Sequence, residues 1–301
     1  MGNTTLGVSF HFPTLSYLHI RYSLADRISS LPDSILCDIL SSLPTKEVVA
    51  TSVLSKRWIH LWRSVPSFHF DYVGDLFDCD KDFNDYYDFL ESVNSFLLSR
   101  NRDQPIHRFR FSCFSNVYDP TDILTSVNAA MSGRVQHMDF SLMSMNVLPS
   151  VVFSCKTLVV LKLAFTRVLD IPSVDFPLLK ILHLFSVSLS GDLDLSQLLS
   201  ACPNLEDLEA KDVSCETKGK FNRLPKLVRA SIDEHFPLEI VKDVEVLFID
   251  WINHQKLDFE FQNLVQLKLT LGHSKDWFGV LEVLKHCPKL QTLAIYIPNK
   301  V

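Results

Sequence analysis

The sequence predicts an α/β protein in which a small module of three helices is followed by an irregular repeat solenoid with a parallel sheet. Apolar residues recur at helical spacing between residues 33 and 62, and a shorter apolar pattern recurs from residue 106 onward. The 301 residues, 47% of them hydrophobic, suffice for one large or two modest domains. We expect a poorly ordered leader over residues 1–25, the helical module over 26–71, an acidic linker with an amphipathic helix over 72–102, and the solenoid over 103–301.

Composition and missing motifs exclude several functions. The 29 basic and 35 acidic residues leave a net charge of −6, so we expect no nucleic-acid partner. There is no G-x-G, no H-E-x-x-H and no C-x-x-C, and no pair of histidines is spaced i, i+4. We therefore expect no cofactor, no metal site and no catalytic residue. An enzyme remains a rival that would need a pKa-perturbed carboxylate or histidine in a pocket.

Cysteine usage and hydropathy indicate the compartment. Seven cysteines, an odd number, are spread along the chain and resemble buried thiols rather than a disulfide framework. No apolar run reaches the ~18 residues that a membrane span needs. Residues 1–25 lack the basic start and continuous apolar run of a signal peptide. We expect a cytoplasmic or nuclear protein without a membrane partner.

The helical module should contain three short helices. Asp33 is expected to cap the first, Pro44 to end it, and Thr45 to cap the second. A third short helix should present Trp58 and Trp62. So small a module cannot bury all of its Leu, Ile and Trp surface, which favours a partner that docks against it.

The segment DRISSLPDSILCDILSSLPTKEVVATSVLSKRWIHLWRSVPSFHFD resembles the F-box of the large plant F-box family. That resemblance implies docking onto a Skp-type adaptor and, through it, a cullin, within a ubiquitin ligase. It also implies the candidate adaptor contacts, which are Leu31, Pro32, Ile35, Leu36, Ile39, Leu40, Leu43, Pro44, Leu54, Trp58 and Trp62.

Two other interpretations of the module remain open. Each of these aliphatic residues could hold the helices together instead of contacting a partner, although Leu31 and Pro32 precede the first helix and are the better interface candidates. A helix-turn-helix DNA reader would use Lys56, Arg57 and Arg63. The balanced charge of residues 26–71 and the two Trp of the third helix disfavour it.

Acidic residues dominate positions 71–91. Asp78, Asp80 and Asp82 imitate the start of a calcium-binding loop, but Phe83 and Phe89 stand where the glycine and the bidentate glutamate should be. We expect a solvated loop that leads into an amphipathic helix ending near Ser99. Its apolar side should carry Tyr86, Tyr87, Leu90, Val93, Phe96 and Leu97.

The solenoid is predicted by one pattern, in which an apolar residue is followed by others three and five positions later. Its nine copies start 17 to 29 residues apart, around the period of leucine-rich repeats. They begin at Ile106, Val135, Leu158, Leu179, Leu205, Leu227, Val244, Leu264 and Leu290. Cys155, Cys202 and Cys287 each precede a first leucine by three residues and should be buried.

The irregular repeats also resemble those of plant F-box proteins of the F-box/FBD/LRR type, as in FPLLKILHLFSV and LLSACPNLEDLEA. Many members of that group continue into a further FBD region, which is absent before Val301. We therefore expect a shortened or alternatively ended gene product.

Residues between the repeat anchors should point away from the core and form a concave binding surface. The candidate target contacts are Lys162, His183, Glu209, Arg229, Phe248 and Lys268, of which the aromatic Phe248 is the most informative. We expect a non-catalytic substrate-recognition subunit of a ubiquitin ligase that binds an unknown target protein. The alternative is a leucine-rich-repeat scaffold that joins no ligase.

Overall fold

The computed structural model describes residues 27–74, 79–101, 103–115, 120–132, 134–169, 171, 173–190, 194–215, 221–251, 256–271 and 277–297. The leader expected over residues 1–25 lies outside the described residues, as do Asp78 and the side chains of Asp80 and Asp82 from the calcium-like motif.

Three short helices form the predicted module. They are α1 (Asp33–Leu40), α2 (Thr45–Ala50) and α3 (Trp58–Leu61), with 3₁₀ turns η1 (Thr51–Val53) and η2 (Trp62–Ser64). Their apolar stripes meet in a small core of Leu36, Cys37, Leu40, Val48, Trp58, Leu61 and Val65. The three-helix prediction is confirmed.

Both capping predictions for this module are wrong. The cap positions of α1 and α2 are Pro32 and Pro44, and neither helix has a side-chain cap. Asp33 and Thr45 are the first helical residues instead, one position too far along to serve as caps. The Thr45 hydroxyl oxygen accepts a hydrogen bond of 2.8 Å from the backbone N–H of His69, so it ties α2 to the first strand.

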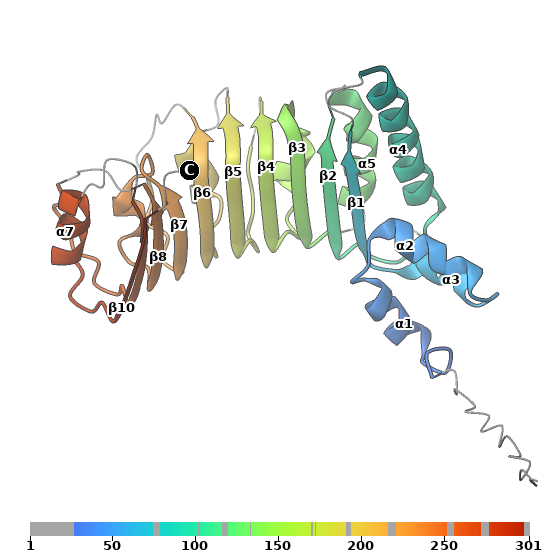
Figure 1. Ribbon diagram of the computed structural model, residues 1–301, viewed down its shortest axis with the longest axis horizontal. Helices are drawn as coiled ribbons and strands as arrows, with labels where there is room; N and C mark the ends of the chain where they lie inside the picture. Colours follow the sequence, from blue (N-terminus) through green and yellow to red (C-terminus); the bar gives the residue numbers. More distant parts are fainter. Residues whose placement is uncertain are drawn as a thin grey trace, which may run out of the picture.

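Within the described residues, ten parallel strands form one sheet in strict sequence order, which confirms the predicted solenoid (Figure 1). The strands are β1 (Ser67–Val73), β2 (Arg108–Phe114), β3 (His137–Val147), β4 (Val160–Val168), β5 (Ile181–Leu189), β6 (Asp207–Ser214), β7 (Arg229–Asp233), β8 (Val246–Asp250), β9 (Gln266–Thr270) and β10 (Thr292–Tyr296). The helical module lies at the β1 end of this sheet.

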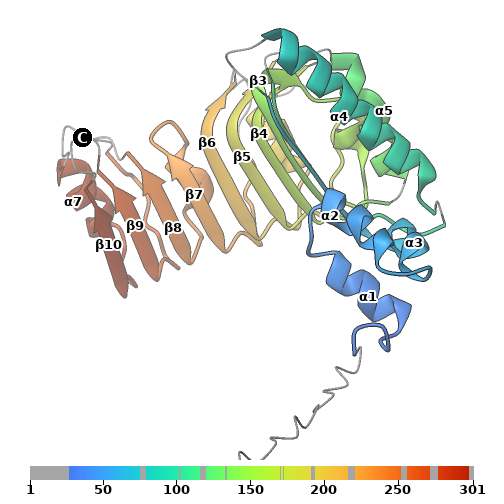
Figure 2. The ribbon, with the colours of Figure 1, turned by 45° about the vertical axis from the view of Figure 1, so that its right-hand side comes forward.

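The connections between strands cover one face of the sheet. They are α4 (Cys79–Ser99), α5 (Pro120–Ser132), η3 (Ser150–Ser154), α6 (Leu195–Ser200), η4 (Leu238–Val241) and α7 (Trp277–Lys285). Figure 2 shows the curved sheet with α4 and α5 against one side of it near β1. Apolar residues of these connections join the strand anchors in a single core, so the opposite face is left open.

Anchor residues of the first eight repeats are all buried. In the ninth repeat Leu290 and Ile295 are only partly buried, and Leu293 is exposed. The difference follows from stacking, because each repeat is covered by its neighbour and β10 has a neighbour on one side only among the described strands.

A further copy of the anchor pattern lies at the start of the sheet and was not predicted from the sequence. Val65, Phe68 and Phe70 have the same spacing as the other anchors and are buried, and β1 passes through the last two. The sheet therefore starts within the segment assigned to the helical module. The long helix α4 separates this copy from the next one, so the regular repeat period does not reveal it.

Helix α4 confirms the amphipathic helix that was predicted to end near Ser99, although it begins at Cys79, where a loop was expected. Tyr86, Leu90, Val93, Phe96 and Leu97 are buried as predicted. Tyr87 is exposed instead, and its ring lies 4.8 Å from that of Phe83 on the outer side of the helix.

The three cysteines expected in the core are buried. Burial raises the pKa of the Cys202 thiol to about 12 and that of Cys287 to about 11. Both therefore remain protonated near neutral pH and pack as small apolar groups. Among the described helices, none is both long and apolar enough to span a membrane.

Candidate docking surfaces

Large apolar side chains remain exposed on the helical module after its core is filled. Val53 is 85% exposed and Leu54 is 63% exposed, at the end of η1. The exposed set is Ile28, Ile35, Ile39, Val49, Val53, Leu54 and Ile59. So much exposed aliphatic surface on so small a module is typical of a protein-binding site.

Helix α1 shows how one short helix serves two purposes. Leu36, Cys37 and Leu40 face the module core, where the Cys37 thiol lies 3.8 Å from the Leu61 carbonyl oxygen. Ile35 and Ile39, one turn apart, are exposed. The buried side holds the module together, and the exposed side is left for a partner.

The eleven candidate adaptor contacts fall into groups with different burial. Pro32, Ile35, Ile39, Pro44 and Leu54 are exposed. Leu36, Leu40 and Trp58 are buried in the module core, and Leu31, Leu43 and Trp62 pack partly buried against it. Sequence reasoning missed the exposed residues Ile28, Val49, Val53 and Ile59. The candidate set came from the F-box resemblance, which did not single out these four residues.

Trp62 joins the helical module to the solenoid. Its side chain packs against both hydrophobic cores, and its ring centroid lies 5.0 Å from that of Phe96 in α4. Beside it, the backbone N–H of Asn101 donates a 3.0 Å hydrogen bond to the Arg63 carbonyl oxygen. These contacts hold the module in a defined position at the β1 end of the sheet.

Arg57 organises the chain that leads into α1. Its Nη1 donates to the Ser29 carbonyl oxygen at 2.5 Å, and its Nη2 donates to the Leu31 carbonyl oxygen at 2.5 Å. Its Nε donates to Asp33 Oδ1 at 2.8 Å. One guanidinium therefore holds the backbone around Leu31 and Pro32, using the fork of donors that lysine lacks.

Replacing Arg57 with Ala is expected to loosen residues 27–32 and to lower the free energy of unfolding by about 1 kcal/mol, because the lost hydrogen bonds are charge-assisted but partly solvated. Amide hydrogen exchange of this segment measures the loosening, and thermal denaturation measures the stability. Lys56→Ala, which removes the neighbouring exposed cation, serves as the control. Equal exchange in the two variants would contradict the role assigned to Arg57.

Five of the six candidate target contacts lie in one row across the open face. Strand pairing aligns Lys162 with His183, His183 with Glu209, and Phe248 with Lys268. Ser231 of β7 completes the row between Glu209 and Phe248. Because alternate residues share a face, Arg229 lies on the same face but in a neighbouring row, two positions earlier along β7.

Polar and aromatic side chains of this open face lie close to one another. The His183 imidazole lies 3.5 Å from Glu209 and 3.6 Å from Asp207. Arg229 pairs with Asp207 at 3.1 Å, from the neighbouring row. The Lys268 ammonium lies 4.8 Å from the centroid of the Phe248 ring. Such partly exposed pairs add little to stability, so they can be rearranged by a bound partner at small cost.

Histidines at the β1 end of this face are biased toward the neutral form. Burial, and then the positive charge of Arg110, lowers the pKa of His69. Burial, and then the charges of Arg108 and His107, lowers the pKa of His137. Both imidazoles therefore carry less positive charge at neutral pH than their ordinary pKa would give.

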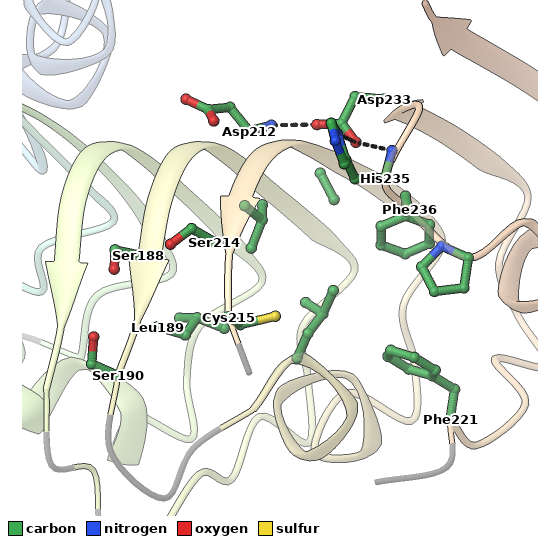
Figure 3. A pocket seen from close by; sticks show the side chains of 14 residues that line it. Ser188, Leu189, Ser190, Asp212, Ser214, Cys215, Phe221, Asp233, His235 and Phe236 are labelled. Carbon is green, nitrogen blue, oxygen red and sulfur yellow. Dashed lines mark hydrogen bonds and ion pairs between the residues drawn. The ribbon is translucent and has the colours of Figure 1, made fainter. Parts of the chain in front are cut away.

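A cavity of about 760 Å³ lies at the carboxyl ends of β5 and β6 (Figure 3). Ser188, Ser214 and Cys215 line its wall, and Asp233 and His235 lie at its rim. At this rim the backbone N–H groups of Asp212 and His235 donate hydrogen bonds to the Asp233 carboxylate. These bonds fix the local backbone conformation. Within the described part of the chain, no group of three or more His, Cys, Asp and Glu side chains could hold a metal ion.

A second cavity, of about 680 Å³, is lined by residues of the helical module, of β1 and of α4. Its apolar wall comes from Val49, Trp62, Phe70, Phe89 and Phe96. It lies beside the joint that Trp62 makes, so the exposed apolar surface of α2 continues toward the solenoid.

Comparisons with known families match both parts of the chain. The family model of the F-box domain matches residues 28–70. A second model, described as the LRR repeats of the FBD-associated F-box protein At5g56370, matches residues 129–229.

Individual proteins of Arabidopsis thaliana are similar over longer stretches. The chain is 40% identical to the F-box/FBD/LRR-repeat protein At3g52680 over 228 residues, which cover 72% of this chain and 48% of that protein. It is 33% identical to the F-box/LRR-repeat protein At4g14096 over 267 residues, which cover 82% of this chain and 56% of that protein. It is 37% identical to the putative F-box/FBD/LRR-repeat protein At5g22670 over 192 residues, 62% of this chain and 41% of that protein.

The chain thus spans about half the length of the curated relatives it matches. The helical module, the ten-stranded parallel sheet and these matches agree with one another. The chain belongs to the plant family of F-box proteins with leucine-rich repeats.

Proposed function

We propose that this chain is the substrate-recognition subunit of a Skp–cullin–F-box type ubiquitin ligase. Its helical module docks a Skp-type adaptor, which connects it to a cullin, and the open face of its sheet binds a target protein. The observation that carries the proposal is the exposed aliphatic set of the module, which remains after the module has filled its own core. F-box domains generally bind adaptors of this kind.

The packing of Trp62 between the helical module and the solenoid supports this role. A receptor of this type accelerates transfer by holding the target close to the ligase, which raises the effective concentration of the reacting groups. The module and the open face are parts of one continuous structure, so a bound target would be presented in a defined orientation. Such a subunit needs no catalytic residue of its own and acts in the cytoplasm or nucleus.

Co-purification with a Skp-type adaptor tests the proposal. Wild type should retain the adaptor, and a Val53→Glu/Leu54→Glu variant should lose it, because two carboxylates would be buried against an apolar partner surface. Both residues are exposed, so the variant should remain folded. Val73→Glu places one such carboxylate at an exposed valine of β1 and should retain the adaptor.

A scaffold that joins no ligase is the rival function. It would leave the wild-type chain folded and soluble but without adaptor in the same experiment. Retention of the adaptor by Val53→Glu/Leu54→Glu would show instead that the exposed aliphatic set is not the docking surface.

A further inference from the structure

Two large aromatic side chains are exposed beside the open face, because Phe185 lies within β5 and Trp251 directly follows β8. Phe185 is 43% exposed and Trp251 is 46% exposed. Both border a cavity of about 290 Å³ that lies between their strands. Exposed aromatic rings beside a hollow are frequent anchors of protein-binding surfaces.

Carboxylates surround this cavity and outnumber its cations. Its lining includes Asp212, Asp233, Glu234 and Asp250, together with Lys211 and the exposed imidazole of His235. The Lys211 ammonium is already engaged, at 2.7 Å from Asp250 and 3.7 Å from Glu209. Asp212, Asp233 and Glu234 therefore leave an excess of negative charge beside the two rings.

Hydrogen bonds orient two of these carboxylates. The Ser186 hydroxyl donates to Asp212 Oδ2 at 2.7 Å, and the backbone N–H of Asp212 donates to Asp233 Oδ2 at 2.6 Å. The backbone N–H of His235 donates to Asp233 Oδ1 at 3.0 Å (Figure 3). The Asp212 and Asp233 carboxylates are thus held in place by hydrogen bonds.

The backbone here is also strained. Ser186, Asp212 and Trp251 adopt left-handed conformations with φ of 51°, 53° and 64°. Ser186 lies within β5 and Asp212 within β6, whereas Trp251 directly follows β8. Phe165 of β4 shares this conformation, with a φ of 55°. The left-handed conformation is unfavourable for residues other than glycine, and strained backbone of this kind is concentrated at functional sites.

Negative charge beside aromatic faces is complementary to a guanidinium. An arginine side chain stacks on an aromatic ring with its flat face and donates hydrogen bonds from its edge to carboxylates. We propose that the corner formed by Phe185, Asp212, Asp233, Glu234 and Trp251 binds an arginine side chain of the target protein. The proposal rests on the proposed function, because it specifies the target chemistry recognised by the open face.

Binding of labelled peptides to the purified full chain tests this corner. Three ten-residue peptides of glycine and serine carry two central arginines, two lysines or two citrullines, and fluorescence anisotropy at low salt measures each affinity. The arginine peptide should bind at least about ten-fold more tightly than the citrulline peptide, which has the same shape without the charge. The lysine peptide should bind more weakly than the arginine peptide.

Matched variants locate the binding. Asp212→Asn/Asp233→Asn keeps the shape of the corner and removes two charges, and Phe185→Ala/Trp251→Ala removes both rings. Each should weaken arginine-peptide binding about ten-fold or more. Tyr296→Ala removes an exposed aromatic ring of β10 outside the corner and should leave the affinity unchanged. Circular dichroism checks that all three variants are folded.

Several outcomes would overturn the inference. They are equal affinity for the arginine and citrulline peptides, equal affinity for the arginine and lysine peptides, no binding at all, or unchanged binding in either corner variant. Adaptor co-purification is measured on the same protein. A chain that retains the adaptor but fails the peptide test loses only this inference, whereas failure of adaptor binding concerns the proposed function alone.

Discussion

Replacing Ile39 with Ala is expected to weaken adaptor binding while leaving stability nearly unchanged, whereas replacing its neighbour Leu40 is expected to destabilise the fold. Ile39 is 49% exposed and Leu40 is 2% exposed, although they are adjacent in α1. Truncating a buried leucine to alanine costs about 2–5 kcal/mol, because contacts are lost and a cavity remains. Truncating an interface anchor costs binding energy of about 1–2 kcal/mol or more, without disturbing the core.

Titration with purified adaptor and urea denaturation separate the two effects. Ile39→Ala should raise the dissociation constant about ten-fold or more and keep the denaturation midpoint. Leu40→Ala should lower the midpoint. If Ile39→Ala lowered the midpoint as much as Leu40→Ala did, the two sides of α1 would not have the separate roles described above.

Replacing Phe140 with Ala is expected to destabilise the solenoid more than any substitution on the open face. Its side chain is fully buried, and its ring lies 5.8 Å from that of Phe109 and 6.1 Å from that of Phe111. Loss of a buried phenylalanine costs about 3–5 kcal/mol. Since one kcal/mol shifts the melting temperature of a chain this large by about 2–4 °C, the midpoint should fall by about 10 °C.

Phe278→Ala is the control for this prediction, because Phe278 in α7 is 74% exposed. Differential scanning fluorimetry of both variants measures the effect. A Phe140→Ala midpoint within about 2 °C of wild type would contradict a solenoid core that is continuous from β2 to β4.

Much of the architecture could be predicted from the residues because the anchor spacing reflects how each repeat is built. The eight repeats that begin between Ile106 and Leu264 bury their anchors as expected. The copy at Val65, Phe68 and Phe70 escaped because α4 breaks the period. The cap positions were missed because Pro32 and Pro44 begin the helices without offering a side-chain acceptor.

The candidate surfaces were less predictable than the fold. Helical spacing identifies the apolar residues of α1 but does not tell which side meets the small core, so Ile39 and Leu40 look alike in the sequence. Alternation along a strand predicts which residues face outward. It does not reveal the left-handed residues Ser186 and Asp212, within β5 and β6, or Trp251, directly after β8. The corner near Phe185 therefore emerges only from the structure.

Direct calorimetric titration of the purified chain with a purified Skp-type adaptor tests the central claim most directly. The proposed docking predicts a saturable complex with a negative heat-capacity change, since burying exposed aliphatic side chains removes apolar surface from water. A folded chain that shows no binding, with its solenoid intact by circular dichroism, would contradict the assignment of this chain to a ligase.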